Sequence, residues 1–153
     1  MKITAQEEYG LRCLLQLAKV SAGQIVSVKE IAVKEGLSSA YVEKLLRILS
    51  RAGLVHSTRG INGGYALNRP ASSTTLGEVI RALGAVQPTD HICTVFTGNA
   101  PACVHFSDCG IRSVWSGLTN YIQSFLDQTA LSSLLESEYT VSARLAQRGT
   151  VSK

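Results

Sequence analysis

Two short amphipathic segments joined by a glycine constrain this chain more than any other feature. The first opens with Ser27-Val28-Lys29-Glu30, a capping-box pattern that predicts a helix start, and Gly36 suits the left-handed residue that ends a helix. The second segment follows the turn and is expected to be the third helix of the chain, after one over residues 4–20 and the one that begins near Ser27. Its buried face has apolar residues at helical spacing: Val42, Leu45, Leu46 and Leu49. Two short helices joined by a turn containing Gly predict a helix-turn-helix motif.

A pair of short strands is predicted directly after these helices. Residues 54–59 and 65–67 have strand-like composition, and Gly60-Ile61-Asn62-Gly63-Gly64 between them supplies residues that tolerate positive φ. The two strands therefore form a hairpin with a glycine-rich tip. A helix-turn-helix followed by a hairpin is a winged helix.

The remaining patterns complete a mainly α fold with one small β-hairpin. Residues 4–20 and 76–83 are predicted helices, the latter capped by Thr74 or Thr75, and residues 130–136 are a short helical candidate. We expect a winged helix-turn-helix domain over residues 1–83, a cysteine-containing sensor loop over 84–111, dimerisation helices over 112–138 and a frayed polar tail over 139–153. The widest apolar stripe lies on a long helix from about residue 112 to 128: Val114, Leu118, Tyr121, Ile122 and Phe125.

Composition and charge narrow the class of protein. The chain has 153 residues, 45% of them apolar, enough for one core. No run approaches 18 consecutive apolar residues and the N-terminus turns acidic, so we expect a soluble cytoplasmic protein that does not enter a membrane. Residues 1–69 carry ten Lys or Arg against five Asp or Glu, whereas residues 70–153 carry five against six. This positive N-terminal half is expected of a surface that faces phosphate.

The third helix and the wing supply the candidate DNA-binding residues. Hydroxyl and carboxylate groups on the outward helix face can reach base edges in a major groove, and Lys or Arg can meet phosphate. A cation beside glycines at the wing tip suits a narrow minor groove. The candidates are Ser39, Tyr41, Glu43, Lys44 and Arg47 on the helix, and Arg59, Gly60, Asn62, Gly63 and Gly64 on the wing.

Three of the four cysteines lie in one irregular stretch. Cys93, Cys103 and Cys109 are separated by nine and five residues, and Cys13 stands alone in the first helix. In a cytosolic protein such a group indicates an iron-sulfur cluster, redox-active thiols or inert cysteines, and the spacing leaves all three open. Cys13 is expected to be a buried small apolar residue. No Ser/His/Asp grouping, phosphate-binding loop or dinucleotide fingerprint is present, so we do not expect an enzyme.

Several of these segments together resemble the Rrf2 family of bacterial winged-helix regulators, which includes the IscR, NsrR and RirA branches. The resemblance runs from residue 1 to about 128 and includes the cysteine loop. Its segments are MKIT at 1–4, GLSSAYVEKL at 36–45, AGLV at 52–55, RGINGGY at 59–65 and TLGEVI at 75–80. It implies that residues 38–44, Ser38 included, belong to the recognition helix, that residues 59–65 form the wing, and that the long C-terminal helix crosses its mate in a homodimer.

The resemblance also implies a cofactor. Cys93, Cys103 and Cys109 would ligate an iron-sulfur cluster, 2Fe-2S or 4Fe-4S, and the five-residue second gap is the usual one in the family. Arg112 stands where the IscR branch has a ligating His, so IscR-type ligation is not expected. Glu8 matches the place of an acidic ligand that the NsrR branch supplies from the other subunit. Among Glu8, Glu7, His105 and Asp108 we therefore favour Glu8 as fourth ligand.

The leading hypothesis is a homodimeric regulator of transcription, expected as a repressor, that binds a double-stranded DNA operator. An iron-sulfur cluster that senses iron-sulfur status, nitric oxide or redox stress would gate its DNA affinity. One alternative is a regulator that lacks a cluster and senses through thiols or a small molecule. Another, of a different class, is a cytosolic thiol-redox or electron-carrier protein whose helix-turn-helix is only a scaffold.

Overall fold

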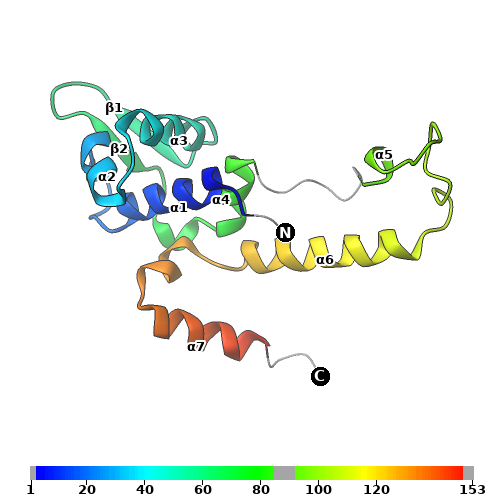
Figure 1. Ribbon diagram of the computed structural model, residues 1–153. Coiled ribbons are helices and arrows are strands. Elements are labelled where there is room, and N and C mark those ends of the chain that lie inside the picture. Colours follow the sequence, from blue (N-terminus) through cyan, green and yellow to red (C-terminus); the bar gives the residue numbers. More distant parts are fainter. Residues whose placement is uncertain (1–2, 85–91, 150–153) are drawn as a thin grey trace.

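The computed structural model describes residues 3–84 and 92–149, and the fold within them is mainly helical with one antiparallel pair of strands. Figure 1 shows α1 to α4 and the hairpin as one body, from which α6 extends. In chain order the elements are α1 (Ala5–Ala18), α2 (Val28–Glu35), α3 (Ser39–Arg51), β1 (Val55–Thr58), β2 (Gly64–Leu67), η1 (Ala71–Ser73), α4 (Leu76–Leu83), α5 (Ile92–Val95), α6 (Gly110–Asp127), η3 (Leu131–Leu135) and α7 (Glu138–Gly149). The predicted fold class is confirmed.

Local chemistry explains where the first three helices begin and end. The Ser27 hydroxyl accepts a hydrogen bond from the Glu30 amide at the start of α2, and Gly36 ends that helix with φ +66°. The Ser38 hydroxyl caps α3 by accepting from the Tyr41 amide at 3.3 Å. The predicted capping box of α2 is only half present, because the Glu30 carboxylate accepts from Lys34 one turn later at 2.7 Å.

The wing is a tight hairpin whose glycines have different roles. β1 pairs with β2 from Val55↔Leu67 to Thr58↔Gly64. Gly60 alone of the three tip glycines has positive φ, at +119°. The segment was predicted to tolerate positive φ, and the turn uses that tolerance at Gly60. A Cβ on Gly63 would lie 2.6 Å from the Thr58 carbonyl oxygen, and one on Gly64 would lie 2.3 Å from that of Val26, so both are glycine because backbone passes close by.

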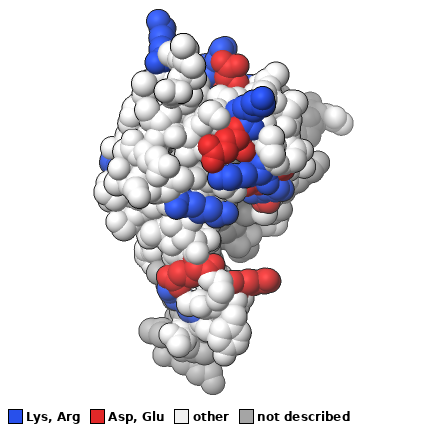
Figure 2. Space-filling view, turned by 90° about the vertical axis from the view of Figure 1, so that its left-hand side faces the viewer, with Lys and Arg blue, Asp and Glu red and all other residues white. Residues whose placement is uncertain are grey.

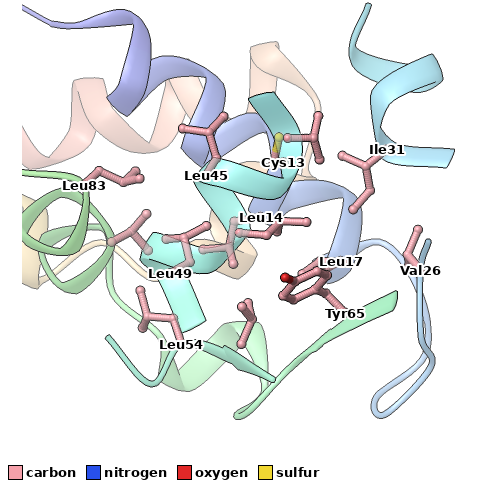
Figure 3. Close-up of a cluster of buried hydrophobic side chains, with 14 of the residues drawn as sticks. Cys13, Leu14, Leu17, Val26, Ile31, Leu45, Leu49, Leu54, Tyr65 and Leu83 are labelled. Carbon is pink, nitrogen blue, oxygen red and sulfur yellow. The ribbon is translucent and has the colours of Figure 1, made fainter. Parts of the chain in front are cut away.

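The core joins the helices to the base of the wing. Figure 3 shows side chains from α1, α2, α3, α4 and the hairpin converging on one apolar cluster, with Cys13 among them. The α3 residues predicted to face inward are all fully buried. Burial of each such Leu stabilises the folded state by about 1.5–3 kcal/mol relative to an exposed Leu. The inward face of α3 therefore fixes which side of that helix meets solvent.

The carboxyl end of α6 is tied to the body through α4. The Leu76 amide donates to the Thr129 carbonyl and the Leu131 amide donates to the Thr74 carbonyl, each at 2.8 Å. Gly77 allows the close approach, because a Cβ there would lie 1.8 Å from the Asp127 side chain, which also pairs with Arg81 at 2.8 Å. The amino end of α6 and residues 92–109 consequently extend away from the body (Figure 1).

The chain after η3 differs from the prediction. Residues from 140 onward were expected to fray, yet α7 continues to Gly149. The Ser137 hydroxyl accepts from the Thr140 amide at 3.3 Å, and Arg144 pairs with Glu136 at 2.5 Å, so a cap and an ion pair hold the first turns. The predicted loop over 84–111 contains the one-turn helix α5 and the start of α6, while residues 85–91 and 150–153 of the predicted loop and tail lie outside the described residues. Of the described helices, none has both the length and the apolar content that crossing a bilayer requires.

Candidate DNA-binding surface and cysteine segment

α3 presents a polar face opposite its buried one. Ser39 and Lys44 are exposed on it, and the Ser38 hydroxyl, also at the surface, is engaged in the helix cap. Because the inward residues fix the rotation of this helix, its outward side chains are held in one orientation. This arrangement is the two-sided helix that the sequence predicted.

Glu43 and Arg47 form an ion pair along that face. Arg47 Nη2 lies 2.5 Å from Glu43 Oε1, with the two side chains 63% and 45% exposed for Arg47 and Glu43, respectively. The hydrogen bond that Arg47 donates to Glu43 raises the pKa of Arg47 above its ordinary value. The charge of Arg47 is therefore partly neutralised by Glu43, one turn earlier on the same helix. The i, i+4 spacing of the two residues permits this pair, which was not among the predicted features.

Tyr41 departs from the predicted outward orientation. It is half-buried and packs edge-on against Tyr9 of α1, with ring centroids 6.1 Å apart and planes at 81°. The Arg12 guanidinium lies 5.4 Å from the centre of the Tyr9 ring. The ring of Tyr41 thus fastens the first turn of α3 to α1, and only part of it faces solvent.

A partly buried ion pair near this contact joins Arg12 of α1 to Glu35 at the end of α2, and no sequence pattern predicts it. Arg12 Nε lies 2.6 Å from Glu35 Oε2, and Gln16 donates to the same carboxylate. The Glu35 side chain is only 8% exposed and that of Arg12 is 41% exposed, so the pair links α1 to the end of α2 with its carboxylate covered and its guanidinium partly in water. The two charges are 23 residues apart in the chain, and no short-range pattern in the sequence could have revealed them.

The wing places its predicted residues at unequal depths. Arg59, Gly60 and Asn62 are exposed at the tip, Gly63 is half-buried and Gly64 is buried against Val26. Gly64 is therefore a packing residue of the wing base rather than part of its surface. Arg59 and Asn62 are the two polar side chains that the tip offers to a ligand.

Charge on this side of the molecule is mixed rather than uniformly basic. Figure 2 views the winged-helix end and shows Lys and Arg side chains at the top and across the middle, with Asp and Glu side chains between them. The surplus of basic residues in the first 69 positions therefore appears as separate cations, some paired locally, such as Lys34 with Glu30 at 2.7 Å.

The cysteine segment comprises residues 92–109 and leads into α6. Its three thiols, Cys93, Cys103 and Cys109, are free and half-buried. The Phe106 amide donates to the Cys103 carbonyl at 3.1 Å, and Arg112 on the first turn of α6 donates to the Phe106 carbonyl at 2.8 Å. The Arg112 guanidinium also lies 5.7 Å from the centre of the Phe106 ring, which fastens the segment to the helix.

The two acidic residues at the start of α1 have different surroundings. Glu7 is buried and closes a capping box with Thr4, whose amide donates to Glu7 Oε2 at 2.7 Å. Glu8, the next residue, is exposed at the surface of α1. α1 belongs to the body, whereas the cysteine segment lies at the other end of α6 (Figure 1).

The donors have the chemistry of an iron-sulfur site without its assembled geometry. Free thiols on one segment suit a thiolate-ligated group. Over residues 3–84 and 92–149, however, no three His, Cys, Asp or Glu side chains are close enough together to hold a metal ion. One subunit as described does not bring the predicted ligands into a single cluster.

Cys13 has the environment that the sequence predicted. It is fully buried among apolar side chains, and desolvation raises the pKa of its thiol to about 11. This thiol is therefore protonated at neutral pH and belongs to the core rather than to the candidate site.

A helix-turn-helix with a braced hairpin, an exposed polar face on its third helix and a long emergent helix defines a winged-helix DNA-binding protein. Comparison with known proteins specifies the family. The family model described as "Iron-dependent Transcriptional regulator" matches residues 3–137. The chain belongs to this family, the Rrf2 family, whose members are regulators of transcription.

Three similar proteins illustrate the relationship. The chain is 35% identical to protein rrf2 of Nitratidesulfovibrio vulgaris over 88% of this chain and 87% of that protein. It is 32% identical to the transcriptional regulator IscR of Cereibacter sphaeroides, over 90% and 89%. The structure of CymR, described as the global cysteine regulator of B. subtilis, superposes with a TM-score of 0.70 at 30% identity and covers 88% of this chain and 95% of CymR. The electron-carrier alternative finds no support among them.

Proposed function

We propose that this chain is a cytoplasmic, homodimeric repressor that acts by binding operator DNA and not by catalysis. The observation that carries the proposal is α3: its inward face is locked into the core while Ser39, Lys44 and Arg47 remain at the surface beside the wing. α3 would enter the major groove, and Arg59 at the wing tip would lie over the minor groove, where a narrow groove attracts cations.

Glu43 and Arg47 would both contact DNA, in different ways. A carboxylate near DNA repels phosphate, so the benefit of Glu43 lies in accepting a hydrogen bond from cytosine N4, while Arg47 meets phosphate or a base. Their ion pair means that Glu43→Ala also frees a cation. Selection of binding sites from a random-sequence library should show Glu43→Ala with relaxed sequence preference and little loss of affinity. An unchanged preference removes Glu43 from base reading.

Homodimerisation is supported by the free face of α6. Apolar side chains repeat along it at helical spacing, and those 45–70% exposed are Ile111, Val114, Trp115, Leu118 and Tyr121. Such a stripe on a projecting helix is an unfavourable exposure unless another surface covers it. A second copy of α6 would supply that surface, and the two recognition helices would then enter successive major grooves about 34 Å apart.

We further propose that Cys93, Cys103 and Cys109 hold an iron-sulfur cluster, with Glu8 of the partner subunit as fourth ligand. The free thiols, the exposed carboxylate and the family's iron-dependent description support this assignment. Such a cluster supplies a centre that reacts with oxygen and nitric oxide. Cys109 directly precedes α6, so ordering of the cysteine segment would act on the helix that spaces the two DNA-binding domains.

Metal analysis tests this assignment. Anaerobically purified protein should contain iron and sulfide, and Ala at any of the three clustered cysteines should abolish stable loading, whereas Cys13→Ala should retain it. Glu8→Ala should alter the absorption spectrum of the loaded protein and its sensitivity to oxygen. The spectrum of Glu7→Ala should match that of wild type. Loss of iron in a folded, dimeric Cys13→Ala variant contradicts the ligand set.

A second candidate is a regulator that senses through its thiols without a cluster. It is favoured by the half-buried free thiols, by their separation in the described chain and by the likeness to a cysteine regulator. Iron-free protein with full operator affinity, together with loss of that affinity when the three thiols are modified, would select this candidate over the first.

A further inference from the structure

The tip of the wing carries an apolar side chain that the fold itself does not use. Ile61 is 105% exposed, the highest value among the large hydrophobic residues of the described chain. Single exposed apolar residues are common on protein surfaces, so exposure alone assigns no role. The surroundings of Ile61 make this one specific.

The backbone holds Ile61 in a fixed position. The Gly63 amide donates to the Gly60 carbonyl at 2.9 Å, which closes a four-residue turn with Ile61 and Asn62 at its centre. The bridge between Tyr65 and Val26, with both amide-to-carbonyl distances 2.9 Å, anchors the base of the hairpin to the body. A partner therefore meets a pre-formed tip, which lowers the ordering cost of binding.

The charge around this tip favours an anionic partner. Residues 44–77 include five cations, of which Arg47 pairs with Glu43 and Arg69 with Glu78, while Lys44, Arg51 and Arg59 are exposed. Arg59 precedes Ile61 by two residues and Asn62 follows it directly, and both are exposed. An apolar side chain between a cation and an amide matches the minor groove of DNA, which has anionic edges, hydrogen-bond acceptors on its floor and apolar sugar faces along its walls.

We propose that Ile61 is an apolar contact of the wing with the deoxyribose walls of the minor groove. This inference rests on the proposed DNA-binding function and adds to it a source of affinity that is independent of salt. Arg59 would supply the part that depends on salt, because a cation that neutralises a phosphate releases a counterion and an isoleucine releases none.

Binding measured across a range of salt concentrations separates the two contributions. The probe is a short duplex selected from a random-sequence library by the full-length wild-type protein, and the variants are Ile61→Ser, Ile61→Leu and Arg59→Ala. The control is Tyr139→Ser, which removes a large side chain that is 84% exposed on α7. Ile61→Ser should raise Kd about three- to tenfold at every salt concentration and keep the wild-type slope of log K against log salt.

The other variants define the limits of the effect. Ile61→Leu should bind like wild type, and Arg59→Ala should flatten the slope by about 0.9. A Kd for Ile61→Ser equal to that of Tyr139→Ser, or a flattened slope in Ile61→Ser, overturns the proposal. A wild-type protein that selects no duplex overturns the proposed function itself, and the two failures are thereby distinguished.

Base substitution in the probe tests the groove. Inosine·cytosine pairs keep the minor-groove face of A·T pairs, whereas G·C pairs add an amino group to its floor. The substitution is made at the minor-groove position that the wing protects. The difference in Kd between wild type and Ile61→Ser should persist on the inosine·cytosine duplex and shrink on the G·C duplex. An equal difference on both duplexes contradicts the minor-groove contact.

Discussion

The four cysteines of this chain differ in what surrounds them and not in their own chemistry. Cys13 is enclosed by the core, and burial raises the pKa of its thiol to about 11, whereas Cys93, Cys103 and Cys109 are half-buried. Since the thiolate is the reactive form, Cys13 should be the inert thiol.

Alkylation should distinguish these thiols in metal-free, reduced protein. Iodoacetamide at neutral pH should modify the three clustered cysteines well before Cys13, which should react only as the protein unfolds. Peptide mass spectrometry over a time course gives the rates. Cys13 reacting as fast as Cys109 in the folded protein would contradict its placement in the core.

Gly64 shows a packing requirement that a glycine-rich motif conceals. A Cβ at this position would lie 2.3 Å from the Val26 carbonyl oxygen, and backbone cannot move aside as a flexible side chain can. We predict that Gly64→Ala lowers the free energy of unfolding by about 2 kcal/mol or more. Urea denaturation measures it.

Gly117→Ala is the matched control for Gly64→Ala. Gly117 is on α6, and apart from the adjoining backbone of that helix no described atom lies within 4 Å of the added Cβ, so the urea midpoint should stay the same or rise. Equal midpoints for the two variants would show that the wing base tolerates a side chain.

Helices whose apolar spacing and caps agree were predictable from the sequence. α2 and α3 follow from Ser27, Gly36 and the inward residues of α3, because these are short-range patterns. The Arg12–Glu35 pair and the Tyr9–Tyr41 contact were not, because they join separate helices whose packing angle no local pattern encodes. The composition of α7 is polar, and its cap and ion pair depend on Glu136 and Ser137 before it.

The candidate site also combines features that the sequence predicts with features that depend on tertiary contacts. The polar face of α3 follows from the period of its apolar residues, and the exposed wing tip follows from its turn. The burial of Gly64 and the separation of the cysteine segment from α1 arise from tertiary contacts, which spacing in the sequence does not specify.

The capping box of α4 gives this element a measurable dependence on pH. The Thr75 amide donates to Glu78 at 2.8 Å and Arg69 pairs with the same carboxylate at 2.8 Å. The backbone hydrogen bond from Thr75, followed by that from Arg69, lowers the pKa of Glu78 below its ordinary value of 4.5. A carboxylate with a lowered folded-state pKa contributes stability above its unfolded pKa and loses it as the pH falls through the folded value.

We therefore predict that Glu78→Gln reduces the dependence of stability on pH. The free-energy difference between wild type and variant should be largest at neutral pH and should vanish below the folded-state pKa of Glu78. Urea titrations from neutral pH to about pH 3 measure it, since most carboxylates protonate over that range. A difference that stays constant with pH would mean that the ionised carboxylate is not what stabilises α4.

The whole molecule consists of a packed body and a projecting helix. The carboxyl end of α6 is bonded to α4, while the side chains along its apolar face are 45–70% exposed in the described part of its own subunit. We predict that Leu118→Arg, on the 47% exposed side chain of that face, converts the dimer to monomers without unfolding the body. Sedimentation velocity gives the mass and circular dichroism the fold. Asn120→Arg, on the opposite side of α6, should remain dimeric, and a dimeric Leu118→Arg variant would place the interface elsewhere.

We propose that the state of the cysteine segment sets DNA affinity, and an anaerobic binding experiment can show this coupling. Affinity for the selected duplex is measured for the cluster-loaded protein and again after the cluster is removed, with a Cys93→Ala, Cys103→Ala, Cys109→Ala triple variant treated identically. Affinity should change by about tenfold or more in wild type, equivalent to about 1.4 kcal/mol of coupling, and should not change in the triple variant. Equal wild-type affinities before and after removal, in protein verified to have carried iron and sulfide, would contradict it.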